Sequence, residues 1–447
     1  MTSLYKMRNA DGLHRPWKWR RLVHVCRRWR SVVFGSSVSL DLRLVCGPRT
    51  RVELTGIWPP LPIIITDRIN RPVPEDYGFA AAIVHPNRVC ELNLVHLTRS
   101  QLPRLISAMQ EPFPSLIHLK LCLDNGNGRP VLALPDGFLG GYASRLQSLE
   151  LDSIPFPALP KLLLSATDLV LLTLWNIPYF EYISSEAMVA GLAASAYLKY
   201  LAIKFESTLS HPRRESRRPP PRTRTVLPAL TRFVFHGLSN YLEDLVGRID
   251  TPMLDSIEMT FFHQVMVDLP QLGELMGRTT SFQALNEAHV HYDFNGIQVE
   301  SFPPIRSLGD MSGLRISCRV YRYSLSYLVK VIASFFPSIY IAEHLYIYGP
   351  RNLSLIWQDD IEYMELSHPF SSVRNLYICE GFTECIAPAV QYLQQDLELD
   401  VTDLLPFLES LYLEELQLSG PVQGAIGQFV AARQLLGRPV AVSSWER

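Results

Sequence analysis

Two histidines separated by one residue, His289 and His291, come nearest in this sequence to the spacing of a metal site. Side chains two positions apart on a β-strand point to the same face, as two ligands of one ion must. Asp293 follows, but the next position is Phe294 and supplies no further nitrogen ligand. Because Val290 occupies a core position of the repeat described below, we expect both histidines on the solvent face of a strand and no metal site.

The sequence lacks the patterns that mark common catalytic and cofactor sites. The seven cysteines are scattered and include no Cys-x-x-Cys pair, which favours free thiols in a reducing compartment over a zinc site or a disulfide framework. The glycine-rich residues 125–128 are not followed by Lys-Ser or Lys-Thr, and no Gly-x-Ser-x-Gly occurs. We therefore expect no catalytic residues, no metal and no cofactor.

Two stretches of the chain are strongly basic. Residues 1–30 hold nine lysines and arginines against one acid, Asp11, and residues 211–224 hold six arginines among prolines. The helix expected in this region places its aromatic side chains on the face opposite the charges, so no aromatic side chain interleaves with them. We therefore expect a solvated face or a surface for an acidic partner, and no nucleic acid. Residues 207–228 are expected to form a mobile Arg/Pro-rich loop, because they offer little to a core. A nuclear-localisation role for this loop stays open.

The composition is that of a packed chain. Of 447 residues, 47% are hydrophobic and 19% charged, and the formal net charge is −1. A nearly neutral chain is not expected to bind nucleic acid as a whole. Its most apolar windows, 162–175 and 327–348, are interrupted by Asp168, Lys330, Pro337 and Glu343, so no membrane partner is expected. We expect a cytoplasmic or nuclear protein.

One apolar-x-x-apolar-x-apolar pattern recurs along the chain from Val89 onward. Its copies are separated by 23 to 40 residues, close to the period of about 20–29 residues that leucine-rich repeats show. The middle positions are Leu92, Leu119, Leu149, Leu172, Leu201, Phe233, Ile257, Ala288, Leu314, Leu345, Leu376 and Leu416.

Helix-like pieces lie between these strands at 102–109, 241–249, 323–335 and 383–394. Each unit therefore consists of a strand and a helical return, and it needs its neighbours to bury its apolar face. We expect an α/β, leucine-rich-repeat-like solenoid with a parallel sheet, capped by a helix, a glycine stop and a strand over 425–442. The alternative is an ordinary α/β domain with buried strands.

The N-terminal part of the chain predicts an amphipathic helix over 19–34, closed by Gly35. Trp19, Leu22, Cys26, Trp29 and Val33 recur at spacings of three and four residues, so they share one face and are expected to be buried. The arginines lie largely on the other side of this helix.

The string Leu22-x-x-Val25-Cys26-Arg27-x-Trp29-Arg30, followed by the strand-like residues 39–44, resembles the second half of an F-box. Together with the repeats, the chain resembles fungal F-box proteins with irregular leucine-rich repeats. The resemblance implies a helical segment at 1–46 that docks on the ligase adaptor subunit through Leu22, Val25, Cys26 and Trp29. It also implies a solenoid at 47–447 that binds a protein substrate.

The function implied by this resemblance is that of a substrate-recognition subunit of an SCF-type E3 ubiquitin ligase, without enzymatic activity of its own. The Leu-Pro and Leu-x-x-Ile-Phe helix that normally opens an F-box is not found in residues 1–16. An interaction scaffold that does not bind the ligase adaptor is therefore the alternative, and an enzyme built on the strand-end loops is a third.

Overall fold

The computed structural model has an α/β fold with a mostly parallel sheet. The chain divides into two compact units, the first with residues 1–230 and 248–250 and the second with residues 231–247 and 251–447. Of the sixteen described strands of this sheet, seven lie in the first unit and nine in the second. The structure describes residues 26–35, 42–47, 61–67, 85–124, 132–178, 183–206, 223–262, 269–283, 285–293, 296–302, 312–319, 342–348, 372–378, 405–414 and 421–445.

The predicted α/β class and the mostly parallel sheet are thus confirmed. The assignment to leucine-rich repeats and the division at residues 46/47 stay predictions. Within the described part of the chain, no helix is long and apolar enough to span a membrane.

The seven strands of the first unit follow one another in the order of the sequence, each parallel to the next. They are β1 (Leu44–Cys46), β2 (Ile63–Thr66), β3 (Val89–Leu97), β4 (His118–Leu123), β5 (Ser148–Asp152), β6 (Leu171–Ile177) and β7 (Tyr200–Phe205). A separate parallel pair joins β8 (Thr225–Val226) to β10 (Ile249–Asp250). The last residues of the predicted loop at 207–228 are thus paired, while residues 207–222 lie outside the described segments.

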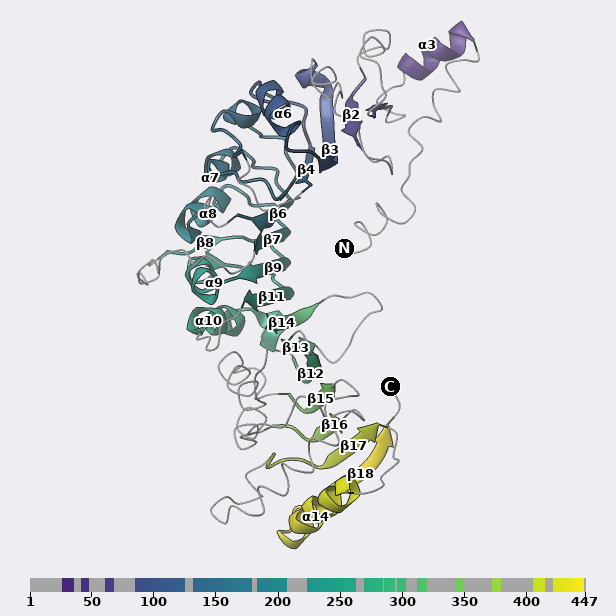
Figure 1. Ribbon diagram of the computed structural model, residues 1–447, viewed down its shortest axis with the longest axis vertical. Helices are drawn as coiled ribbons and strands as arrows, with labels where there is room; N and C mark the ends of the chain where they lie inside the picture. Colours follow the sequence, from purple (N-terminus) through teal and green to yellow (C-terminus); the bar gives the residue numbers. More distant parts are fainter. Residues whose placement is uncertain are drawn as a thin grey trace. The chain divides into compact units, whose positions relative to one another are not determined.

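Helical returns connect most of these strands, and Figure 1 shows α6, α7 and α8 along one side of them. They are η1 (Pro86–Arg88), α6 (Leu102–Ala108), η2 (Phe138–Gly141), α7 (Leu159–Leu163) and α8 (Ser185–Leu192). Alternate strand residues point toward the helices, and the middle leucines of the repeat, from Leu92 to Leu201, are at most 1% exposed. Because the period of a strand is two residues, the pattern leaves the intervening side chains on the opposite face.

The close approach of α7 and α8 depends on a glycine. A Cβ atom at Gly191 of α8 would lie 2.8 Å from Cα and 2.9 Å from the carbonyl oxygen of Pro160 in α7. Such distances are too short for any side chain unless a helix moves. Gly191 therefore sets the spacing between these two neighbouring returns.

A buried carboxylate closes a bulge between β3 and β4. The register of this pair shifts between Leu94 and Leu97, which takes the backbone N–H groups of Val95 and His96 out of the regular ladder. Asp67, 1% exposed and directly after β2, accepts hydrogen bonds from both N–H groups, at 2.9 and 2.8 Å. Its side chain therefore supplies the acceptors that the bulge removes.

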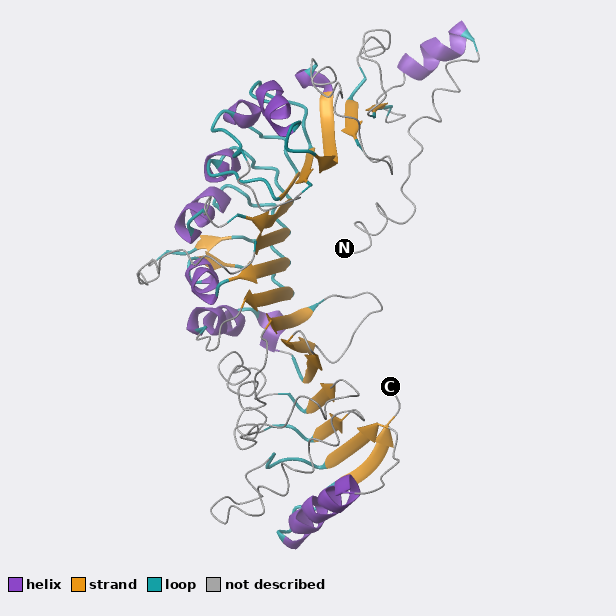
Figure 2. Cartoon of the chain, viewed as in Figure 1, coloured by secondary structure: helices purple, strands orange, loops and turns teal. Residues whose placement is uncertain are grey.

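The second unit contains nine strands in an order that departs from the sequence: β9, β11, β14, β13, β12, β15, β16, β17, β18. Figure 2 shows these strands in orange and the described helices in purple. Their bounds are β9 (Arg232–Gly237), β11 (Ser256–Phe262), β12 (Glu287–Asp293), β13 (Gly296–Phe302), β14 (Gly313–Arg319), β15 (His344–Tyr348), β16 (Asn375–Ile378), β17 (Ser410–Glu414) and β18 (Ala441–Trp445).

The expected order of neighbours is wrong at β12 to β14. The repeat pattern predicts that the strand of Ala288 follows that of Ile257, but β11 pairs with β14, and β12 pairs with β15. The unpredicted strand β13 lies between β12 and β14 and is antiparallel to both. The expectation of a wholly parallel sheet fails here, because the chain reverses after β12 and β13 runs antiparallel to it. As a result, β14 lies between β13 and β11.

The register of the last repeat copy is also corrected. The sequence pattern placed its middle position at Leu416, whereas Leu411 pairs with Leu376 and Leu413 with Ile378. Leu411 and Leu413 are 3% and 1% exposed, so they are the core residues of β17. Several leucines in a row fit the pattern in two registers, and the pairing with β16 selects one of them.

The helices of this unit begin with α9 (Ser239–Val246), α10 (Pro270–Arg278) and α11 (Thr280–Gln283), and an aromatic core holds α9 against the first strands. Phe233, Phe235 and Phe261 are at most 1% exposed, and Tyr241 of α9 stacks on Phe235 with ring centroids 6.0 Å apart. The predicted helices 102–109 and 241–249 are thus found as α6 and α9, although α9 ends before Ile249. The helices predicted at 323–335 and 383–394 lie outside the described residues.

The predicted C-terminal cap is found as α14 (Pro421–Leu435) and β18. Gly437 has φ +72°, the left-handed conformation that ends many helices. The Arg433 side chain is 1% exposed and donates from Nη2 to the Leu408 carbonyl oxygen at 3.0 Å. This bond joins α14 to the segment that enters β17.

Candidate functional site

The outer face of the second unit, which we define by the side chains that alternate with its buried strand residues, carries one continuous cross-strand row. Successive members of this row are register partners on neighbouring strands, from β11 at one end to β17 at the other. They are Glu258, Arg315, Glu300, His289, Tyr346, Tyr377 and Tyr412. The row is charged over β11, β14 and β13 and aromatic from β12 onward.

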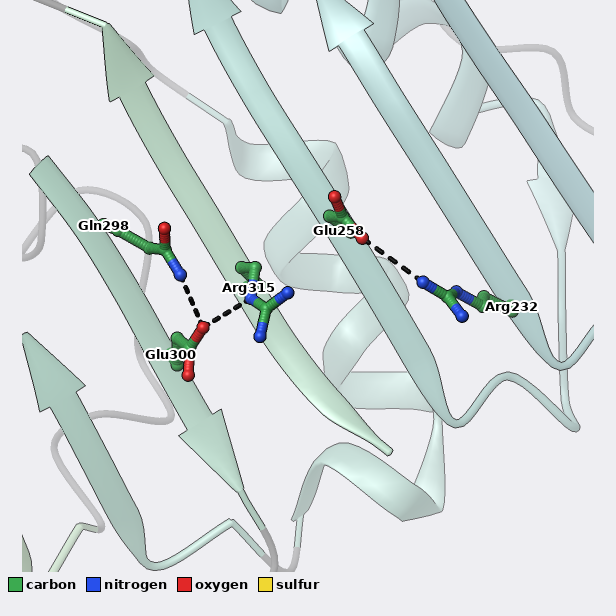
Figure 3. Close-up of polar contacts among 5 residues, drawn as sticks. All are labelled: Arg232, Glu258, Gln298, Glu300 and Arg315. Carbon is green, nitrogen blue, oxygen red and sulfur yellow. Dashed lines mark hydrogen bonds and ion pairs between the residues drawn. The ribbon is translucent and has the colours of Figure 1, made fainter. Parts of the chain in front are cut away.

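The charged residues of the row are paired with one another or with neighbouring side chains of the outer face (Figure 3). Arg315 Nε and Gln298 Nε2 both donate to Glu300 Oε1, and Arg232 Nη2 lies 3.3 Å from Glu258 Oε2. The Glu300 side chain is 11% exposed, and its donors are Arg315 on the neighbouring strand β14 and Gln298 on β13 itself. This part of the outer face is held rigid by its own ion pairs.

The aromatic part of the row, which we call the aromatic ladder, consists of His289, Tyr346, Tyr377 and Tyr412 on β12, β15, β16 and β17. Successive ring centroids are 4.3, 4.2 and 4.4 Å apart, with interplanar angles of 14°, 11° and 7°. Stacked aromatic pairs of this kind contribute about 0.5–1.5 kcal/mol beyond area burial. All four side chains of the ladder are partly buried, so the stacked rings remain partly accessible on the outer face.

A second row and one tryptophan support the ladder. His291 stacks on Tyr348 with centroids 4.4 Å apart, and the Tyr348 hydroxyl lies 3.2 Å from His289 Nδ1. Trp445 of β18 meets Tyr377 and Tyr346 edge to face, at 5.6 and 6.0 Å between centroids. The indole N–H of Trp445 donates to the Ile378 carbonyl oxygen at 3.4 Å, which fixes the ring across the strand ends.

Burial changes the acidity of the ladder. Desolvation raises the pKa of Tyr346 above its usual value, and the negative charge that Tyr377 would carry adds to this effect. Burial likewise raises the pKa of Tyr377. Both side chains are therefore neutral phenols at physiological pH, able to donate and to accept a hydrogen bond.

The structure places His289 and His291 on the outer face, as predicted, with Val290 in the core at 3% exposure. His289 Nε2 also lies 3.7 Å from Glu287 Oε2. Among the described residues, no group of three His, Cys, Asp or Glu side chains is arranged to hold a metal ion. The two imidazole rings pack on tyrosines instead.

The outer face of the first unit carries mainly polar side chains. Lys120 pairs with Glu150 at 2.6 Å, and Lys204 Nζ lies 4.6 Å from the centroid of the half-exposed Trp175 ring. Burial raises the pKa of the Cys122 thiol to about 11. A thiol with such a pKa is almost wholly protonated at neutral pH, which excludes it as a nucleophile there.

The residues predicted to bind a ligase adaptor lie at the N-terminal helix, of which the structure describes α3 (Arg27–Gly35). Leu22 and Val25 lie outside the described residues. Within the chain the helix stripe is buried only in part: Cys26 is exposed, and Trp29 is 50% exposed. Val33, at 1% exposure, is the stripe residue that is buried. The buried residue Val33 lies one helical turn after the exposed Trp29, so the C-terminal part of α3 is buried while the part around Trp29 is exposed.

The aromatic ladder and the strand β13 are not among the features predicted from the sequence. Signals for both are present: a tyrosine follows the middle leucine in Leu345-Tyr346, Leu376-Tyr377 and Leu411-Tyr412, and Asn295-Gly296 is a typical hairpin dipeptide before β13. A comparison of the positions adjacent to the core leucines would have revealed the first.

A search with models of known protein families found none that matches the chain, and a search of curated proteins found no match.

Proposed function

We propose that this protein is the non-catalytic substrate-recognition subunit of an SCF-type E3 ubiquitin ligase. In this role the outer face of the sheet binds a protein target, and the N-terminal helix binds the ligase adaptor. The protein performs no chemistry itself. Two features support the proposal: the F-box-like string at residues 22–30, and the exposed apolar side chains of the helix α3, which a docking helix requires.

The observation that carries the proposal is the exposure of Trp29. A tryptophan and a cysteine on the apolar stripe of a helix are normally buried, because each large apolar side chain gains about 1.5–3 kcal/mol from burial. Here Trp29 is 50% and the neighbouring Val32 56% exposed, while Val33 holds the helix. Exposed aromatic side chains of this kind are frequent anchors of protein interfaces.

The outer face supports the second half of the proposal. Its side chains are fixed by stacking, by ion pairs and by the Trp445 hydrogen bond. A preorganised surface loses little side-chain entropy when a partner binds.

The experiment is co-precipitation of a purified ligase adaptor subunit with the full chain. We compare wild type, Trp29→Ala and Val25→Asp with the control Trp175→Ala, which removes an equally accessible tryptophan from another surface. Far-UV circular dichroism checks that each variant folds. We expect Trp29→Ala to weaken adaptor binding by roughly tenfold or more, as hot-spot truncations do, and Trp175→Ala to bind as wild type.

No adaptor binding by wild type would reject the ligase role and leave the interaction scaffold as the function. Equal losses for Trp29→Ala and Trp175→Ala would reject the assignment of the docking surface to α3.

A further inference from the structure

We propose that the aromatic ladder is the site at which a basic, extended segment of the target protein binds. This inference rests on the proposed target-recognition role and names the chemistry that the outer face recognises. A planar guanidinium stacks on Tyr412 at the open end of the ladder, and further basic side chains lie along the phenol edges.

The open end is defined by the register of β17 and β18. The partner of Tyr412 on β18 is Ser443, an exposed residue whose side chain is too short to cover a phenol ring. On its other side, the Tyr412 ring stacks on Tyr377 at 4.4 Å. One ring face is therefore used inside the protein, and the other lies over a small polar residue.

Charge complementarity selects the partner. The five strands β12, β15, β16, β17 and β18 contain no lysine or arginine, whereas Glu287 and Glu414 are acidic residues on them. Arg374, directly before β16, is paired with Glu409 at 2.6 Å. The carboxylate side chains on these strands are not accompanied by a lysine or arginine of the same strands, which favours a cationic segment and disfavours an acidic one.

The ring stack adds a second attraction for cations. Guanidinium and ammonium groups bind the faces of aromatic rings, and arginine does so most often because its planar group stacks. The hydroxyls of Tyr346 and Tyr377 are in addition neutral acceptors for an N–H donor, because burial raises the pKa of both phenols. Arginine satisfies both demands with one side chain.

The test measures binding of three fluorescein-labelled peptides to the purified full chain by fluorescence anisotropy. The first alternates arginine with glycine, the second replaces each arginine by citrulline, and the third replaces it by glutamate. Citrulline keeps the shape and the planar group of arginine and loses the charge. We expect the arginine peptide to bind at least about tenfold more tightly than the other two.

The variants locate the site. Tyr412→Ser is expected to weaken the arginine peptide by about fivefold or more, and Glu287→Gln by a smaller factor. The control Tyr197→Ser removes a tyrosine that is 62% exposed elsewhere and should bind as wild type. Equal affinity for the three peptides, or equal loss in Tyr412→Ser and Tyr197→Ser, would overturn the inference.

The peptide assay contains no adaptor, so it is independent of the test of the ligase role. Peptide binding without adaptor binding leaves the ladder as a target site of a scaffold. Adaptor binding without preference for the arginine peptide rejects the ladder site and leaves the ligase role intact.

Discussion

Replacing the buried Asp67 by asparagine should destabilise the first unit far more than the small change in side-chain size suggests. The two carboxylate oxygens accept hydrogen bonds from the Val95 and His96 N–H groups at 2.9 and 2.8 Å. The amide of Asp67→Asn offers one oxygen, so one backbone N–H in the β3 bulge keeps an acceptor and the other faces an NH₂ group.

The magnitude follows from the hydrogen bonds that change. A hydrogen bond to a charged partner contributes about 1.5–3 kcal/mol, and a buried donor left without an acceptor costs about 1–3 kcal/mol. We expect a loss of about 2–4 kcal/mol in the free energy of unfolding. The matched control is Asp136→Asn, because Asp136 pairs with Lys161 on the surface, where the two side chains are 71% and 74% exposed. An exposed pair contributes at most about 1 kcal/mol.

The assay is urea unfolding followed by circular dichroism, combined with amide hydrogen exchange read by mass spectrometry. Exchange should accelerate at peptides that contain Val95 and His96 in Asp67→Asn and stay unchanged in Asp136→Asn. If the two variants lose the same stability, within about 0.5 kcal/mol, the carboxylate does not stabilise the bulge in the way argued.

Two further predictions concern helix spacing and the ladder. Gly191→Ala should destabilise the protein by about 1–3 kcal/mol, because the new Cβ would be too close to Pro160. Gly273→Ala places its Cβ where no atom lies within 4 Å and should stabilise α10 by about 0.5–1 kcal/mol. Thermal unfolding of both variants measures these changes, and a Gly191→Ala variant as stable as wild type would contradict the packing of α7 on α8. Because the pKa of Tyr346 is raised in the folded protein, the unfolded chain loses this proton first above pH about 10, and stability falls as the pH rises further. Tyr346→Phe should make that fall shallower, by less than about 1.4 kcal/mol per pH unit, in urea unfolding at alkaline pH; identical slopes for wild type and variant would refute the raised pKa.

For most copies of the repeat, the sequence by itself determined which residues form the core and which face outward. In Leu345-Tyr346-Ile347, as in the other copies, alternation along a strand is a local property, and burial of Leu345 at 1% exposure follows from it. For the same reason, the sequence predicted the outward position of His289 and His291. The helix, glycine and strand near residues 421–445 were predictable from local signals too, because a glycine after an apolar helical stretch marks a helix end.

Only the tertiary structure decided which strands are neighbours. The copies around Ala288 and Leu314 fit one pattern, so the pattern cannot state that β14, and not β12, pairs with β11. That choice depends on the β12–β13 hairpin and on contacts between residues far apart in the chain, which no local period encodes.

The candidate site was decided at the same level. His289 and Tyr412 are 123 positions apart in the sequence, and they share a row because four strands align in one register. Asp67 likewise reads as a polar residue after an apolar strand, and only the bulge of β3 gives its carboxylate two donors. Local alternation fixes the face of a side chain, whereas its neighbours on that face are fixed by the free energy of the whole folded unit.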